Sequence, residues 1–173
     1  ALARVNTADG SLDTSFDTDG RLTTTGGAPQ SKMTAIMQQA DGKLVAAGYQ
    51  YTSPSLQNDF AVLRYNTDGT LDTSFSGDGL QTTGFGTYSD FATSVIQITK
   101  GIHANKIVVA GYETITGTNS EIAIAMYRED GSPETSFASS GKYNTGVSIN
   151  IDEIYDIIER ADGRLLAVGQ INT

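Results

Sequence analysis

The sequence predicts an all-β fold made of repeated four-stranded antiparallel sheets, and three observations support this prediction. One eleven-residue phrase occurs three times and closes at Phe16, Phe75 and Phe137, which are 59 and 62 residues apart. A second phrase, an apolar run that ends in small residues and glycine, recurs in step with the first at 43–49, 106–112 and 164–169. No segment longer than a turn or two shows helical periodicity. A fixed period of this size is typical of stacked copies of one supersecondary unit.

The register between the two phrases is constant. Each phenylalanine is followed by a glycine four residues later, and that glycine by an apolar strand residue 16 residues later, at Ile36, Val95 and Ile157. Length variation falls in an insertion at 101–103 and in the loops after the second apolar strand. Insertions confined to loops indicate stacked units that share one core.

Each repeat reads as four short strands. In the best copy we expect strands at 33–38, 43–49, 59–65 and 80–83. The segment 43–49 is apolar almost throughout, as is typical of a strand buried on both faces. Units of four antiparallel strands repeated every ~40 to 60 residues are the signature of β-propeller blades. A β-solenoid is the alternative.

This interpretation divides the chain into one repeat array. Residues 1–30 form the second half of a blade, 31–89 and 90–151 each form a blade, and 152–173 form the first half of a blade. The two ends thus supply complementary halves, and propellers close with about four to eight blades. We therefore expect further copies of the same repeat or chain as partners. Either two segments close a six-bladed ring, or this is a piece of a longer or processed array.

Composition restricts the function classes. The 173 residues include no cysteine, which excludes disulfides and thiolate metal sites. The net charge of -9 argues against nucleic acid and anionic membranes as partners. No apolar run approaches the ~18 residues of a membrane span, so direct membrane insertion is not predicted.

Two sets of repeated residues have predicted structural roles. Asp-Gly pairs between strands should form tight hairpin turns, because glycine accepts positive φ; these structural turns are Asp9 and Gly10, Asp41 and Gly42, Asp68 and Gly69, Asp130 and Gly131, and Asp162 and Gly163. The three phenylalanines are predicted core anchors of their blades. Ser15, Ser74 and Ser136, which precede them, are expected to cap backbone groups.

The phrase at 65–75, Tyr-Asn-Thr-Asp-Gly-Thr-Leu-Asp-Thr-Ser-Phe, together with Asp-Gly-Lys-Leu-Val-Ala-Ala-Gly at 41–48, resembles the delta-60 repeat family. The resemblance covers essentially the whole chain. It departs in the third copy, where Arg128, Pro133 and Glu134 replace Asn, Leu and Asp. The resemblance implies β-propeller repeats in large secreted or surface proteins of bacteria, with no established enzymatic activity.

Metal binding is a second interpretation of the acidic loops. The spacing of Asn6, Asp9 and Asp13 resembles part of a calcium loop, but Arg4 and Phe16 occupy the positions that need carboxylates. Asp17 and Asp19 form a better local calcium candidate. Their counterparts at 76–78 and 138–140 lose the carboxylates, so calcium is kept only as an alternative to no cofactor.

The sequence offers no set of residues that is expected to converge into a catalytic site. His103 is the one histidine, so neither a zinc site nor a Ser-His-Asp triad is available. Asp152, Glu153 and Asp156 could supply a glycosidase acid pair, since strand alternation places Asp152 and Asp156 on one face. A sugar-binding surface could form from tyrosines on or near loops, namely Tyr49, Tyr51, Tyr88 and Tyr112; packing between blades is the alternative.

We therefore predict a non-enzymatic structural or adhesive repeat segment of a large extracellular bacterial surface or filament protein. The alternative is a ligand-binding propeller for a surface glycan or protein, which the variable loops 53–58 and 115–120 leave open. A propeller-based glycoside hydrolase or lyase ranks third. The expected location is extracellular or at the bacterial cell surface.

Overall fold

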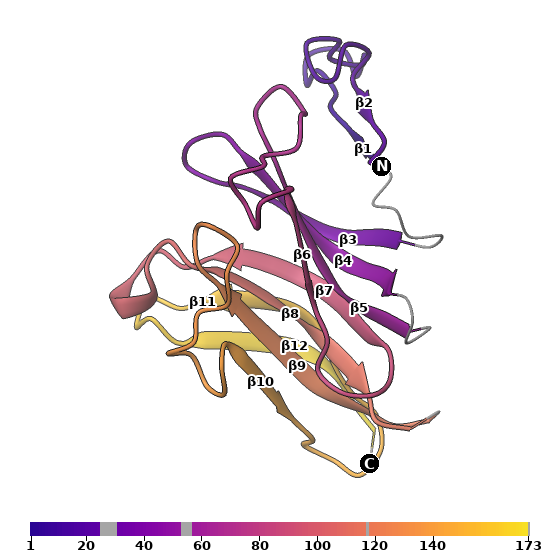
Figure 1. Ribbon diagram of the computed structural model, residues 1–173, viewed down its shortest axis with the longest axis vertical. Coiled ribbons are helices and arrows are strands. Elements are labelled where there is room, and N and C mark those ends of the chain that lie inside the picture. The colour runs from indigo at the N-terminus through magenta and orange to yellow at the C-terminus, as the bar shows by residue number, and fades with distance from the viewer. Residues whose placement is uncertain (25–30, 53–56, 117, 173) are drawn as a thin grey trace.

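The computed structural model describes residues 1–24, 31–52, 57–116 and 118–172 (Figure 1). The predicted fold class is confirmed, since strands make up the described elements apart from one 3-10 turn, Gly101–His103, in the insertion. The strands are β1 Leu2–Ala3, β2 Arg21–Leu22, β3 Ser31–Gln38, β4 Leu44–Thr52, β5 Gln57–Tyr65, β6 Leu80–Thr83, β7 Asp90–Gln97, β8 Ile107–Thr114, β9 Ser120–Tyr127, β10 Lys142–Thr145, β11 Asp152–Glu159 and β12 Leu165–Ile171.

The strands form two antiparallel blades flanked by two half blades. Strands β3 to β6 and β7 to β10 pair in chain order within two four-stranded sheets. The hairpins β1–β2 and β11–β12 form two-stranded sheets near opposite ends of the molecule (Figure 1). By register, β1 and β2 correspond to the third and fourth strands of a blade, and β11 and β12 to the first and second. The variable loops include residues 53–56 and 117, which lie outside the described residues.

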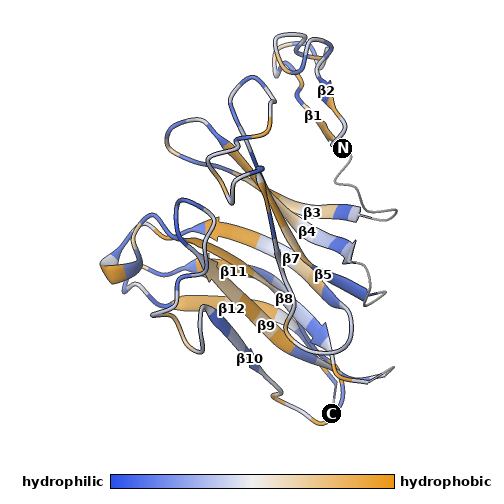
Figure 2. Cartoon of the chain, in the orientation of Figure 1, coloured by the Kyte–Doolittle hydropathy of each residue, from blue (hydrophilic) through white to orange (hydrophobic). Residues whose placement is uncertain are grey.

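The core lies between successive blades, so the central strands are buried on both faces. Val45, Ala47 and Val62 of the first blade pack with Val109 of the second blade. The flanking residue Ala46 packs on the other side, in a cluster that includes Leu2 and Leu22 of the first hairpin. A third cluster joins the second blade to β11, and Figure 2 shows hydrophobic stretches along β8, β9 and β12. This two-sided burial explains the nearly continuous apolar sequence of β4 and β8.

A β-bulge interrupts the first strand of each blade. The pairing register shifts between Met33 and Ala35, and again at the equivalent positions of β7 and β11. The facing residue is Gly48 in β4, where a Cβ would lie 1.9 Å from the carbonyl oxygen of Lys32. Glycine is therefore required for close backbone approach. The bulge is therefore the direct reason for the glycine that ends each apolar run.

None of the helical turns among the described residues is long and apolar enough to cross a membrane.

Candidate functional site

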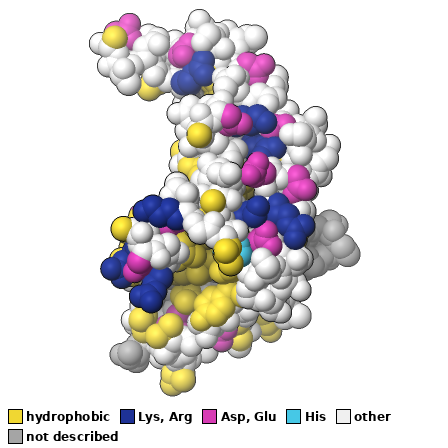
Figure 3. Space-filling model, turned by 90° about the vertical axis from the view of Figure 1, so that its left-hand side faces the viewer, with side chains coloured by type: hydrophobic (Ala, Val, Ile, Leu, Met, Phe, Trp, Pro, Cys, Tyr) yellow, Lys and Arg dark blue, Asp and Glu magenta, His cyan; other side chains and the backbone are white. Residues whose placement is uncertain are grey.

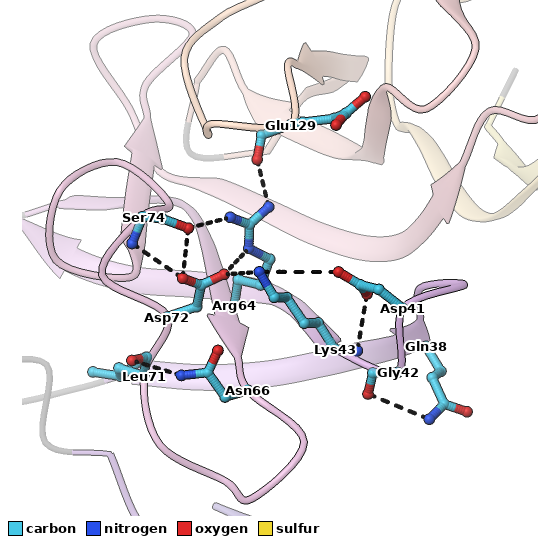
Figure 4. A network of polar contacts seen from close by, with 10 residues as sticks. All are labelled: Gln38, Asp41, Gly42, Lys43, Arg64, Asn66, Leu71, Asp72, Ser74 and Glu129. Atoms are coloured by element: carbon cyan, nitrogen blue, oxygen red, sulfur yellow. Dashed lines mark hydrogen bonds and ion pairs between the residues drawn. The ribbon is translucent and has the colours of Figure 1, made fainter.

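The most elaborate polar cluster of the described chain is centred on Arg64 of β5 (Figure 4). Its Nε donates to Asp72 Oδ2 at 2.7 Å and its Nη2 to Ser74 Oγ at 3.1 Å. Its Nη1 donates to the carbonyl oxygen of Glu129 in the next blade. Lys43 Nζ also reaches Asp72 Oδ2, at 2.9 Å. The guanidinium thus connects the loop at 72–74 to the next blade, and Lys43 of β4 joins the cluster through Asp72.

Asp72 is ionised within this cluster despite being only 5 % exposed. Burial opposes ionisation, but hydrogen bonds from Ser74 and Lys43 and the charge of Arg64 outweigh it and lower the pKa of Asp72 well below its usual range. The Ser74 hydroxyl and N–H both donate to Asp72 Oδ1, at 2.6 and 3.0 Å. The hydroxyl of the repeated serine therefore donates to the aspartate carboxylate, whereas the sequence suggested that it caps backbone groups.

The same cluster recurs in the first repeat and is altered in the third. Arg4 Nε donates to Asp13 Oδ2 at 2.8 Å, and Arg4 Nη1 donates to the Thr67 carbonyl oxygen at 3.0 Å. In the third repeat Met126 takes the place of Arg64 in the strand. Arg128 instead approaches Glu134, with 3.4 Å between Nε and Oε2.

The loops after Phe16 and Phe75 are each bonded to the turn of the following blade. The N–H of Asp17 donates to the Asp68 carbonyl oxygen at 2.9 Å, and the N–H of Ser76 to that of Asp130 at 2.7 Å. Phe16 and Phe75 are 1 % and 0 % exposed. A Cβ at Gly131 would lie 2.9 Å from Ser76 N and 3.0 Å from Phe75 Cδ2. The glycine therefore meets two demands, a positive φ of 86° and close approach of the neighbouring blade.

The Asp-Gly turns share one local arrangement. The five predicted turn glycines, Gly10, Gly42, Gly69, Gly131 and Gly163, all have positive φ. The aspartate before each glycine accepts the N–H of the residue two positions later: Asp9 from Ser11, Asp41 from Lys43, Asp68 from Thr70, Asp130 from Ser132 and Asp162 from Arg164. These hydrogen bonds occupy one carboxylate oxygen in each turn and hold the turn closed.

A polar cleft of about 270 Å³ lies beside the Arg64 cluster, between the first and second blades. Its lining includes Lys43 and Arg64 from the first blade and Gln97 and Glu129 from the second. Gln39 also lines it, and its buried Oε1 has no hydrogen-bond partner among the described residues. This oxygen could accept a hydrogen bond from a ligand hydroxyl.

A buried carboxyl group that the sequence reasoning missed lies at the opposite end of the strands. Asp90 is 0 % exposed; its Oδ2 accepts the N–H of Phe85 at 2.8 Å, and its Oδ1 has no partner in the described part of the chain. Burial raises the pKa of Asp90 to about 7, and the negative charges of Glu113 and Asp59 add to the rise. Burial also raises the pKa of Glu113. With a pKa of about 7, the Asp90 carboxyl group is protonated in part of the molecules at neutral pH. Its sequence signal was weak, because an aspartate at a strand start resembles a turn residue.

The calcium candidates Asp17 and Asp19 lie in the loop after Phe16. Asp19 Oδ1 accepts the N–H of Arg21 at 2.8 Å, as Asp78 accepts that of Leu80 in the next repeat. Over the ranges that the structure describes, no group of three or more histidine, aspartate or glutamate side chains is placed to hold a metal ion. Calcium binding at Asp17 and Asp19 stays a prediction.

The expected placement of Asp152 and Asp156 on one face is wrong. The bulge between Ile154 and Asp156 shifts the alternation by one residue, so these carboxylates point to opposite faces of β11. Asp152 is buried and its Oδ2 accepts the N–H groups of Val147 and Ser148, whereas Asp156 Oδ1 accepts from Ser94 Oγ at 2.7 Å. The two groups do not form an acid pair.

The aromatic candidates divide between packing and exposure. Phe91 packs edge-on against Tyr49 of the first blade, with ring centroids 4.8 Å apart, and lies tilted against Tyr112 of its own blade at 5.2 Å. Tyr88 is half exposed on its loop, and Tyr51 is partly buried at the end of β4. The ring of His103 lies edge-on to Phe137 with centroids 6.3 Å apart.

Blades of four antiparallel strands, joined by repeated loop-to-turn contacts, define a repeat protein of the β-propeller type. In agreement, the family model described as "Domain of unknown function (DUF5122) beta-propeller" matches residues 1–16, 39–75 and 105–137. The matched segments contain all three phenylalanine phrases and the strands β4, β5, β8 and β9. The description gives a fold without an activity, and it does not name the delta-60 repeat. No curated protein matches the chain.

Proposed function

We propose that the chain is a non-enzymatic structural or adhesive repeat segment of a large extracellular bacterial surface or filament protein. The observation that carries this proposal is the use of the repeated polar residues. The charged groups of the phrase, Arg64 and Asp72 with their counterparts Arg4 and Asp13, bond one another and the carbonyl of the next blade. Residues of this kind stabilise an array of blades. They recur in the sequence because the contact between neighbouring blades recurs.

The scaffold role predicts that these residues contribute to stability. Replacement of a residue in a ligand site usually leaves the fold equally or more stable. Removal of one partner of a buried ion pair instead costs about 3 kcal/mol or more. We expect Arg64→Met, which copies the residue at position 126, to lower the free energy of unfolding by about 3 kcal/mol.

Urea unfolding followed by circular dichroism measures this loss. Arg160→Met is the matched control, because Arg160 is exposed and its hydrogen bonds to the described residues are made by its backbone groups. Equal stability of Arg64→Met and the control would argue against a scaffold role for the cluster. The surface location is tested separately by protease treatment of intact cells that produce the protein, where cleavage without lysis is expected.

The second candidate function is glycan binding in the cleft between the blades. It is favoured by the unpartnered, buried Oε1 of Gln39 and by the surrounding Lys43 and Glu129, which can exchange hydrogen bonds with sugar hydroxyls. Titration calorimetry with a panel of neutral and acidic oligosaccharides tests it. A heat of binding that Gln39→Leu abolishes, with unfolding unchanged, would favour this candidate over a purely structural role.

A further inference from the structure

The joint between the first and second blades contains a buried amide where the next joint has an apolar side chain. Gln39 and Ile98 are equivalent, because the N–H of each donates across its hairpin turn, to the carbonyl oxygens of Lys43 and Lys106. Ile98 is 4 % exposed and packs in an apolar cluster. Gln39 is 8 % exposed, and its Oε1 has no partner among the described residues. An unpaired buried acceptor costs free energy, and an apolar residue such as Ile98 avoids that cost.

The next joint also has a direct contact that the first joint lacks. Glu159 of β11 accepts hydrogen bonds from the preceding blade: its Oε2 from Thr99 N and Oγ1 at 2.8 and 2.6 Å, and its Oε1 from Lys100 N at 3.1 Å. Gln97 occupies the equivalent position of β7. Its Nε2 donates to the Asn105 carbonyl oxygen of its own blade at 3.3 Å, and within the described ranges its side chain makes no hydrogen bond to the first blade. The first joint therefore leaves open a space that the next joint closes.

This open space is the polar cleft of about 270 Å³ between the first two blades. It is smaller than the pockets of ~300–1,000 Å³ that enclose drug-sized ligands, so it suits a single ring with its substituents. Figure 3 faces the side of the molecule that carries the turns between strands, and it shows charged side chains of both signs above a hollow with hydrophobic side chains. Polar character is thus confined to part of this side.

The positive groups of the cleft are neutralised, whereas a negative group is free. Lys43 Nζ and Arg64 Nε lie 2.9 and 2.7 Å from Asp72 Oδ2. Arg64 also donates to the carbonyl oxygen of Glu129. The Glu129 carboxylate has no hydrogen-bond or ion-pair partner in the described part of the chain, and Figure 4 shows it turned away from the Arg64 guanidinium. With Gln39 Oε1, the cleft offers a buried acceptor and a free carboxylate to a donor-rich cation.

We propose that this cleft binds an oligosaccharide that carries a free, protonated amino group. The ammonium group donates to Gln39 Oε1 and to the Glu129 carboxylate, and the ring hydroxyls exchange hydrogen bonds with the amides of Gln97 and Asn105. The net charge of -9 favours the approach of a cationic ligand. This inference deepens the second candidate function, glycan binding in the cleft, and rests on it.

Titration calorimetry with two matched ligands tests the assignment. The ligands are a glucosamine tetramer and its N-acetylated counterpart, at a mildly acidic pH where the free amine is protonated. Acetylation removes the charge and keeps the rings and their hydroxyls. We expect the amine form to bind at least about tenfold more tightly, because a charge-assisted hydrogen bond is roughly twice as strong as a neutral one.

Three variants locate the binding site. Glu129→Gln should remove most of the difference between the two ligands, and it preserves the joint because Arg64 bonds only the backbone carbonyl of residue 129. Asp17→Asn is the matched control, since it removes the same charge from a loop that does not line the cleft, and it should leave the difference unchanged. Gln39→Leu should abolish binding of both ligands. Urea unfolding checks that each variant is folded.

Equal affinity for the two ligands would overturn this inference, and glycan binding in the cleft would still hold if Gln39→Leu abolished both heats. The absence of heat with either ligand would also overturn it, and the glycan candidate would then rest on the neutral and acidic oligosaccharides alone. Equally tight binding of a lysine-containing peptide would overturn the assignment to a sugar. The loss of stability expected for Arg64→Met involves no ligand, so the scaffold role is tested separately.

Discussion

Gly131 offers the sharpest test of the joint between blades. Its Cβ position lies 2.9 Å from Ser76 N and 3.0 Å from a ring carbon of Phe75, and its φ is 86°. Gly77 has a nearly identical φ of 87°, and no described residue other than its chain neighbours lies within 4 Å of its Cβ position. Alanine at either position adopts the same strained backbone, and only alanine at Gly131 also collides with the preceding blade.

The expected magnitudes follow from these two terms. Positive φ costs an L-residue about 1–2 kcal/mol, and reduced freedom of the unfolded chain returns about 0.4–1 kcal/mol. Gly77→Ala should therefore lower the free energy of unfolding by about 1 kcal/mol. Overpacking against backbone and ring adds about 1–3 kcal/mol, so Gly131→Ala should lose about 2–4 kcal/mol.

Urea titration of both variants measures the difference in their free energies of unfolding, and equal m-values make the two values comparable. A larger loss in Gly131→Ala assigns the excess to the contact with Phe75 and Ser76. Equal losses would refute the reasoning, because they would mean that the glycine serves only the turn and that the neighbouring loop yields without cost.

Three further predictions concern buried groups and metal. The carboxyl of Asp90 ionises near pH 3.8 when unfolded and near 7 when folded, so its contribution to the free energy of unfolding should fall as pH rises between these values. Asp90→Asn, compared with wild type by urea titration across this range, should remove that part of the slope, by no more than roughly 4 kcal/mol in total. Phe75→Ala should cost about 3–5 kcal/mol in the same assay, and a loss below 1 kcal/mol would contradict its role as core anchor. Chelator should leave the melting temperature unchanged, whereas calcium at ~100 times its dissociation constant would add roughly 2.7 kcal/mol if Asp17 and Asp19 bind it.

Strand order and register were predictable because the repeat carries them redundantly. The constant spacing from Phe75 to Gly79 and then to Val95 predicted which segments pair, and strand Leu80–Thr83 was predicted with its observed bounds. Predicted ends elsewhere differ by up to three residues, as in β4, which continues to Thr52. The strand continues because β5 pairs with it as far as Gln57. Strand ends depend on such pairing, which the local sequence does not encode.

The bulge was not predictable, and it changed the candidate site. A bulge adds one residue without a residue type that predicts it: threonine occupies two of the three bulges, at Thr34 and Thr93, but also many positions without a bulge, and Tyr155 occupies the third. Its consequence is nevertheless large, because it reverses the face of every later residue in the strand. Asp156 thereby moved away from Asp152.

The altered charge cluster of the third repeat bears on both candidate functions. Loss of the arginine at Met126 coincides with Arg128 two residues later and with Glu134, which is one methylene longer than aspartate and extends the carboxylate toward the displaced guanidinium. The ion pair is thus retained while its position in the strand changes. A ligand site would lose its geometry under such a shift, whereas a joint needs only a neutralised charge near the turn. Met126 in turn lines the cleft beside Phe137 together with Ile98 and Leu165, and such apolar side chains favour packing over the binding of an ion.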